Sequence, residues 1–88
     1  PVVTGDAQLD HMRGVVEKIL QQIDEAITIH DFRMVRGKGH TNLIFDMALP
    51  SRLMQQRKQI KKQMDEAIAK ETQSVYYTVV TFDIASFN

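Results

Sequence analysis

The chain contains no cysteine and no tryptophan, only two prolines and four glycines, and no excess of charge of either sign. The lack of cysteine excludes disulfide scaffolds, thiolate zinc sites and cysteine nucleophiles. Eleven basic residues balance eleven acidic ones, whereas a general polyanion binder usually carries a clear basic excess. No apolar run approaches the roughly 20 residues that a membrane span needs, and no signal peptide is visible.

What the chain does contain is enough apolar residues for a globular domain. Hydrophobic residues make up 43% of its 88 positions, more than a disordered segment carries. A chain of this length buries only about 60–65% of its unfolded surface, so its core is thin. The sequence begins Pro-Val-Val without an initiator methionine. We therefore expect residues 1–88 to form one domain excised from a longer protein; a processed N-terminus is the alternative.

The first third of the chain has the pattern of an amphipathic helix. Apolar residues recur at steps of three and four between Ala7 and Asp24. They are Leu9, Met12, Val16, Ile19 and Ile23. Asp6 is expected to cap the helix N-terminus. Gly14 costs a helix about 1 kcal/mol relative to alanine, so we expect another element to pack closely against it.

The rest of the chain predicts three strands and a second helix. Residues 26–36 and 41–49 are rich in β-branched and aromatic side chains, and the glycines of 37–39 predict a hairpin between them. Ser51 is expected to cap a helix whose apolar residues continue to Ile68. Residues 75–84 predict a third strand.

The order α-β-β-α-β indicates an α+β protein with a ferredoxin-like open sheet of three mixed strands and two helices on one face. A right-handed crossover through the second helix is expected to lay the third strand parallel to the first. Apolar residues occupy both parities of every strand: Ile29 and Phe32 in the first, for example. Both faces of the sheet are thus expected to be apolar. The simplest way to bury the face without helices is to pack it against a second copy of the chain. The alternative is a sheet that exposes scattered apolar residues.

Four residues are candidate metal ligands. His30 lies mid-strand, and Asp46 and Asp83 lie inside apolar strands, where a buried carboxylate needs a hydrogen bond, an ion pair or a metal. An imidazole and two carboxylates on one sheet suit zinc, manganese or iron. His40, where the hairpin enters the second strand, is a possible further ligand. The alternatives are a structural histidine and salt bridges, and no local metal-binding spacing favours the metal.

Other functions have weaker support. No nucleophile triad, phosphate loop or matched acid pair is present, so we expect no enzyme. The second helix is basic, but an RNA-binding sheet needs exposed aromatics on a basic face, so we expect no nucleic-acid partner. Two alternatives stay open: a soluble ferredoxin-like metallochaperone, which usually uses a cysteine pair, and a small regulatory or nucleic-acid-binding module.

The sequence resembles the cytoplasmic C-terminal domain of the cation diffusion facilitator transporters, in the form common in Gram-positive bacteria. The likeness lies in residues 30–33 (His-Asp-Phe-Arg), Gly37, residues 40–46 (His-Thr-Asn-Leu-Ile-Phe-Asp) and Pro50, and covers essentially the whole chain. Residues 1–6 resemble the linker that leaves the last membrane helix. The resemblance implies a domain at the cytoplasmic face of the cell membrane, attached to the membrane-spanning part of an exporter of zinc, manganese, iron or cobalt that works in exchange for protons.

The resemblance also implies a homodimer that binds a divalent metal ion, zinc first among the candidates, at its interface. His30 matches the family's ligand histidine, and Asp83 matches its ligand aspartate near the chain end. Asp46 stands where many relatives have a histidine. The chain departs from the pattern at Lys58 and Thr81, near positions where some relatives place further histidines. We therefore expect no two-metal site like that of those relatives; a single site, a weaker site and no site stay open.

Overall fold

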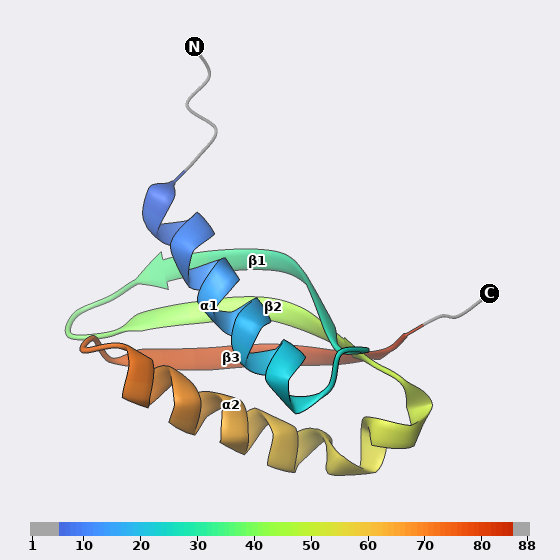
Figure 1. Cartoon of the computed structure of the whole chain (residues 1–88). Helices are drawn as coiled ribbons and strands as arrows, with labels where there is room; N and C mark the ends of the chain where they lie inside the picture. The colour runs from blue at the N-terminus through green and yellow to red at the C-terminus, as the bar shows by residue number, and fades with distance from the viewer. Residues whose placement is uncertain (1–5, 86–88) are drawn as a thin grey trace.

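The structure is a computed structural model in which residues 6–85 are described, so most of the predicted linker, residues 1–5, lies outside them. Two helices cover one face of a three-stranded sheet (Figure 1). This confirms the predicted order and the ferredoxin-like fold. The elements are α1 (Ala7–Ile23), β1 (Thr28–Arg36), β2 (Thr41–Leu49), the 3-10 helix η1 (Ser51–Gln56), α2 (Arg57–Glu71) and β3 (Tyr76–Ile84). Within residues 6–85 no helix has the length and apolar character needed to cross a membrane.

The strand order is β1-β2-β3, with β2 antiparallel to β1 and parallel to β3. The prediction that the third strand runs parallel to the first is therefore wrong. The crossover through α2 starts at the end of β2 and brings the chain back along the sheet. As a result, β3 begins beside the start of β2. Because β1 and β2 form an antiparallel hairpin, the strand that follows the crossover runs against β1.

The core lies between the helices and the sheet. Its centre is β2, whose inward side chains are all at most 1% exposed. They are Leu43, Phe45, Met47 and Leu49. The helices add Met12, Val16, Ile19 and Leu20 from α1 and Ile60, Met64 and Ile68 from α2. The three- and four-residue steps that predicted the helices place these side chains on one stripe of each helix.

A β-bulge interrupts β1. The register passes from the pair His30–Asp46 to the pair Arg33–Ile44, so β1 holds one residue more than β2 between these pairs. Asp31 has a φ of 60°, a left-handed conformation that aspartate tolerates better than most residues. Asp31 is therefore the extra residue of the bulge.

The bulge corrects the predicted faces of β1. Ile29 pairs with Met47 and Met34 pairs with Leu43, and both partners point into the core. Phe32, 9% exposed, also faces the core. Strict alternation put Ile29 and Phe32 on opposite faces; that prediction is wrong, because the extra residue shifts the phase by one position.

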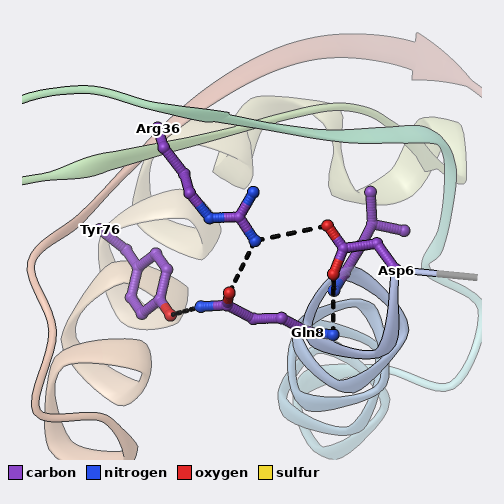
Figure 2. A network of polar contacts seen from close by, with 5 residues as sticks. Asp6, Gln8, Arg36 and Tyr76 are labelled. Atoms are coloured by element: carbon purple, nitrogen blue, oxygen red, sulfur yellow. Dashed lines mark hydrogen bonds and ion pairs between the residues drawn. The ribbon is translucent and has the colours of Figure 1, made fainter.

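The N-terminus of α1 is fastened to the sheet by a polar network (Figure 2). As predicted, Asp6 caps the helix: its Oδ1 accepts hydrogen bonds from the backbone N–H groups of Gln8 and Leu9 at 3.0 and 3.3 Å. Arg36 donates to Asp6 Oδ2 at 3.3 Å and to Gln8 Oε1 at 2.6 Å, and Gln8 donates to the Tyr76 hydroxyl at 3.5 Å. The Leu9 N–H and the Arg36 guanidinium lower the pKa of Asp6.

The second helical segment begins differently from the prediction. Ser51 starts a 3-10 helix, in which the Leu53 N–H donates to the Pro50 carbonyl at 2.9 Å, and its side chain caps nothing. The predicted Ser51 cap is wrong because the tighter 3-10 turn precedes α2. Arg52 forms a two-pronged ion pair with Asp24, the C-cap of α1, at 2.9 and 3.0 Å. This guanidinium lowers the pKa of Asp24.

Gly14 lies on an exposed part of α1, where an added Cβ meets no atom within 4 Å. The predicted close packing against Gly14 is therefore absent among residues 6–85. We expect Gly14→Ala to raise the free energy of unfolding by about 1 kcal/mol and the melting temperature by about 4–8 °C. Gly39→Ala is the control: Gly39 has a φ of 74°, so the same substitution should destabilise. A destabilising Gly14→Ala would contradict the open surface described.

Candidate metal site on the open sheet face

The face of the sheet that carries no helix is called here the open face. Its side chains come from alternate positions of each strand, opposite in direction to the core residues. They are Thr28, His30, Arg33 and Val35 from β1; Asn42, Ile44, Asp46 and Ala48 from β2; and Tyr77, Val79, Thr81 and Asp83 from β3. The half nearer the β1–β2 hairpin is more apolar, and the other half is more polar.

Three of the four predicted ligands lie together on the polar half. His30 is directly opposite Asp46, and Asp46 is level with Thr81, so these three side chains form one row across the sheet. Asp83 lies in the next row, two positions beyond Thr81 on the same strand. Neighbouring strands are about 4.8 Å apart. The sheet thus carries the imidazole and the two carboxylates on adjacent strands, which strand prediction alone did not establish.

The carboxylates are less buried than the sequence predicted. Asp46 is half-buried and Asp83 is exposed, and no charged side chain among residues 6–85 is fully buried. The expectation that both carboxylates are buried is wrong, because both point to the open face rather than into the core. His30 is exposed, and its Nε2 lies 3.1 Å from Thr28 Oγ1.

The side chains are not gathered into a ligand cluster. In the described part of the chain, no group of three or more histidine, aspartate or glutamate side chains is arranged to hold a metal ion. One chain supplies the pair His30 and Asp46 with Asp83 beside it. The donor types suit zinc or manganese, but a closed coordination sphere needs side-chain movement or further donors.

His40 lies at the opposite end of the open face. It precedes Asp46 by six positions along β2, a separation of about 20 Å in a strand. Its Nδ1 lies 3.1 Å from the Lys38 carbonyl oxygen, and its ring packs on Tyr77 with centroids 5.1 Å apart. A Cβ on Gly37 would lie 3.3 Å from this ring. His40 is therefore out of reach of a metal ion held by Asp46 in the same chain.

An apolar patch occupies the other half of the open face. We define this patch as Val35, Ile44, Tyr77 and Val79. Three of its members are more than half exposed, at 52% for Val35, 56% for Tyr77 and 52% for Val79, while Ile44 is half-buried. The predicted apolar character of the second face is thus found on β2 and β3, whereas the bulge leaves β1 mostly polar there.

Charged residues on β1 and α2 interact with residues close to them in the sequence rather than with the candidate ligands. Arg33 donates from Nε to the Asp31 backbone carbonyl oxygen at 3.3 Å. In the basic second helix, Lys61 pairs with Asp65 at 2.9 Å, and Lys58 is exposed. Thr81 stands in the row of His30 and Asp46, so this departure from the family pattern falls inside the candidate site.

One acidic residue near His30 was missed by the sequence analysis. An open hollow of about 490 Å³ between α1 and the start of β1 is lined by Glu17, Gln21, Thr28 and His30, among others. Gln21 donates to the Ile27 carbonyl at 2.9 Å and holds this turn to the helix. Glu17 lies on the polar surface of α1, and only the docking of α1 beside β1 associates it with His30.

The chain matches no family model and no curated protein sequence. Its fold is similar to that of a solved structure described as "MamB CTD magnetosome protein" from Desulfamplus magnetovallimortis BW-1. The TM-score is 0.71, the sequence identity is 15%, and the match covers 90% of this chain and 98% of that one. At this identity the likeness concerns the fold. The chain therefore folds like MamB CTD over nearly the full length of both.

Proposed function

We propose that this chain is the cytoplasmic regulatory and dimerisation domain of a divalent cation exporter of the cation diffusion facilitator family, in the form common in Gram-positive bacteria. It is non-catalytic and binds a divalent ion on its open face, with zinc first and manganese, iron or cobalt as alternatives. The observation that carries the proposal is the row that sets His30 opposite Asp46, with Asp83 beside it. The residue pattern resembling that family and the fold shared with MamB CTD support it.

The open position of these side chains suggests how metal and association are coupled. An ion held by His30, Asp46 and Asp83 on an exposed face keeps coordination positions open toward solvent. A second chain that packs on the same face closes those positions and covers the apolar patch. Metal binding then favours the dimer, because a ligand stabilises the state that binds it more tightly. In the parent protein, metal-favoured dimer formation would move the two domains, and this movement would be transmitted to the attached membrane-spanning part.

A metal titration tests the site. We expect zinc or manganese to raise the melting temperature of the wild-type chain by several degrees, since an ion at 100 times its dissociation constant adds about 2.7 kcal/mol. His30→Ala and Asp46→Ala should abolish the shift. His40→Ala is the matched control and should keep it, because His40 lies at the other end of the face.

Thr81→Ala and Thr81→His sharpen the test. Thr81→His adds a second imidazole to the row of His30 and Asp46 and should give a larger zinc-dependent shift than the wild type. Thr81→Ala should leave the wild-type shift in place. If neither the wild type nor Thr81→His responds to metal, the metal proposal is wrong. Several membrane spans encoded upstream in the parent gene would support the exporter over a soluble metal-binding module.

A further inference from the structure

A second hollow lies where the β1–β2 hairpin meets the turn between α2 and β3. The two turns lie side by side (Figure 1), because the Thr41 N–H donates to the Val75 carbonyl oxygen at 3.0 Å. The space between them has a volume of about 410 Å³. We call it the hairpin hollow, and it is lined by Arg36, Gly37, Gly39, His40, Thr41, Gln73, Ser74 and Val75. His40, out of reach of the candidate metal site, therefore belongs to a different surface.

The lining of the hairpin hollow contains basic side chains and no carboxylate. Arg36 supplies a permanent positive charge, and His40 supplies an imidazole. Other hollows among residues 6–85 contain acidic side chains. The hollow between α1 and β1 contains Glu17, and another along α1 contains Asp10 and Glu71. In a chain without net charge, an acid-free lining with an arginine favours an anion as the ligand.

Arg36 has donors left for such an anion. Its Nη2 donates to Asp6 Oδ2 at 3.3 Å and to Gln8 Oε1 at 2.6 Å (Figure 2). Within residues 6–85, Nε and Nη1 donate to no acceptor, and the side chain is exposed. Hydrogen bonds from a guanidinium to a phosphate are charge-assisted and stronger than those between neutral groups. The contacts with Asp6 and Gln8 fix the guanidinium and leave its other nitrogens for a ligand.

The two turns add backbone donors. In the described part of the chain, no acceptor is bonded to the N–H groups of Gly39, His40, Gln73 and Ser74. Gly39 has a φ of 74°, and successive N–H groups in a turn that includes such a residue form a concave surface that binds anions. The hydroxyl groups of Thr41 and Ser74 also have no hydrogen-bond partner among residues 6–85. Backbone and hydroxyl donors from both turns thus border the same space as the guanidinium.

His40 is held in one orientation at this hollow. Its Nδ1 lies 3.1 Å from the Lys38 carbonyl oxygen and carries a proton, because a carbonyl oxygen only accepts. The ring packs on Tyr77 and against Gly37, where a side chain would leave it little space. Nε2 is then the ring nitrogen left for a ligand. It accepts from the hydroxyl of a monoprotonated phosphate when the imidazole is neutral, and it donates when the imidazole is protonated.

We propose that the hairpin hollow binds a phosphate-type oxyanion, either the free ion or the headgroup of an anionic lipid. Arg36 binds the charge, and the N–H groups of the two turns bind the remaining oxygens. Binding of the free ion does not depend on the proposed function. The lipid source rests on it: Asp6, the last residue of the predicted linker, is bonded to Arg36. The hollow therefore lies at the end of the domain that the proposed function places nearest the membrane.

An NMR titration with inorganic phosphate tests the site. The amide signals of residues 38–40 and 73–74 should shift in a saturable way. Chloride at the same ionic strength should leave them unchanged, because it reproduces only the screening.

Matched variants test whether the response comes from the hairpin hollow. Ser74→Asp places a carboxylate in the lining and should weaken phosphate binding about tenfold or more. Ser51→Asp is the control: it changes the net charge equally at the other end of β2, about 27 Å away, and should bind like the wild type. Arg36→Gln should also weaken binding about tenfold or more. If loss of the Asp6 contact unfolds Arg36→Gln, the comparison of Ser74→Asp with Ser51→Asp still decides.

Sedimentation with vesicles distinguishes the two sources. The probes are phosphatidylcholine vesicles with and without phosphatidylglycerol. If a lipid headgroup is the ligand, vesicles with phosphatidylglycerol should bind the wild type and Ser51→Asp and should not bind Ser74→Asp. A wild-type chain that binds phosphate and stays in solution with both kinds of vesicle identifies the free ion as the ligand.

A chain that shows no saturable shift with phosphate and binds no vesicles overturns the inference. Equal binding of either probe by Ser74→Asp and Ser51→Asp also overturns it, because the hollow is then not the site. Neither result affects the metal titration of His30 and Asp46, so the proposed function stands or falls separately. Phosphate binding by a chain that shows no response to metal supports this inference and contradicts the proposed metal site.

Discussion

Replacing Phe45 by alanine is expected to remove about 3–5 kcal/mol from the free energy of unfolding. Phe45 is 1% exposed at the centre of β2 and stacks on Phe32 with ring centroids 5.5 Å apart. Its removal leaves a cavity between sheet and helices that a thin core cannot refill. Because small domains are stable by only about 5–15 kcal/mol, this one substitution removes a large share of the total. Urea and thermal unfolding measure the loss.

Tyr77→Ala is the control for Phe45→Ala. Tyr77 is also an aromatic residue of the sheet, but it is 56% exposed on the open face. We expect its substitution to change stability by less than about 1 kcal/mol. Equal losses for Phe45→Ala and Tyr77→Ala would mean that the open face is packed as tightly as the core, contrary to the structure. A loss at Tyr77 that grows with protein concentration would instead indicate an interface there.

Deleting Asp31 is expected to preserve the fold, while deleting Arg33 is expected to disrupt it. Asp31 is the extra residue of the bulge. Without it, His30 is followed directly by Phe32, and β1 alternates regularly between the open face and the core with its pairing to β2 unchanged. Deleting Arg33 instead moves either Phe32 or Met34 out of the core, at a cost of about 2–5 kcal/mol.

Circular dichroism and thermal unfolding of the two deletion variants measure this difference. The Asp31 deletion should melt cooperatively and keep the NMR contacts that place His30 opposite Asp46. The Arg33 deletion should melt at a much lower temperature or lack a cooperative transition. If the Asp31 deletion behaves like the Arg33 deletion, the bulge is essential to β1 rather than an insertion in it. The comparison is informative because both variants lose one residue from the same strand.

The elements that could be predicted are those specified by local sequence. The helical stripe from Leu9 to Ile23 and the Asp6 cap depend on residues within a few positions of one another, so the sequence reveals them directly. The hairpin is also local, because Gly39 supplies the positive φ that its turn needs. Ser51 failed as a helix cap because the choice between a 3-10 and an α-helical first turn depends on packing as well as on the capping residue.

The faces of the strands could not be predicted by alternation alone. A single extra residue, Asp31, reverses the phase of β1, and its side chain gives no local sign of a bulge. The direction of β3 was mispredicted because the crossover through α2 joins β2 to β3 and makes these two strands parallel, so β3 runs antiparallel to β1. Asp46 is half-buried because its position in β2 alternates with those of the core residues Phe45 and Met47, so its side chain points to the open face.

The sequence by itself determined the order of helices and strands, the absence of thiol chemistry and the donor types of the candidate site. These follow from composition and from periodicities that span a few residues. Tertiary structure alone decided that His30 and Asp46 share a row with Thr81 and that β3 lies at the edge of the sheet. Strand register and strand order join residues far apart in the chain, and they are fixed by the packing of the whole core.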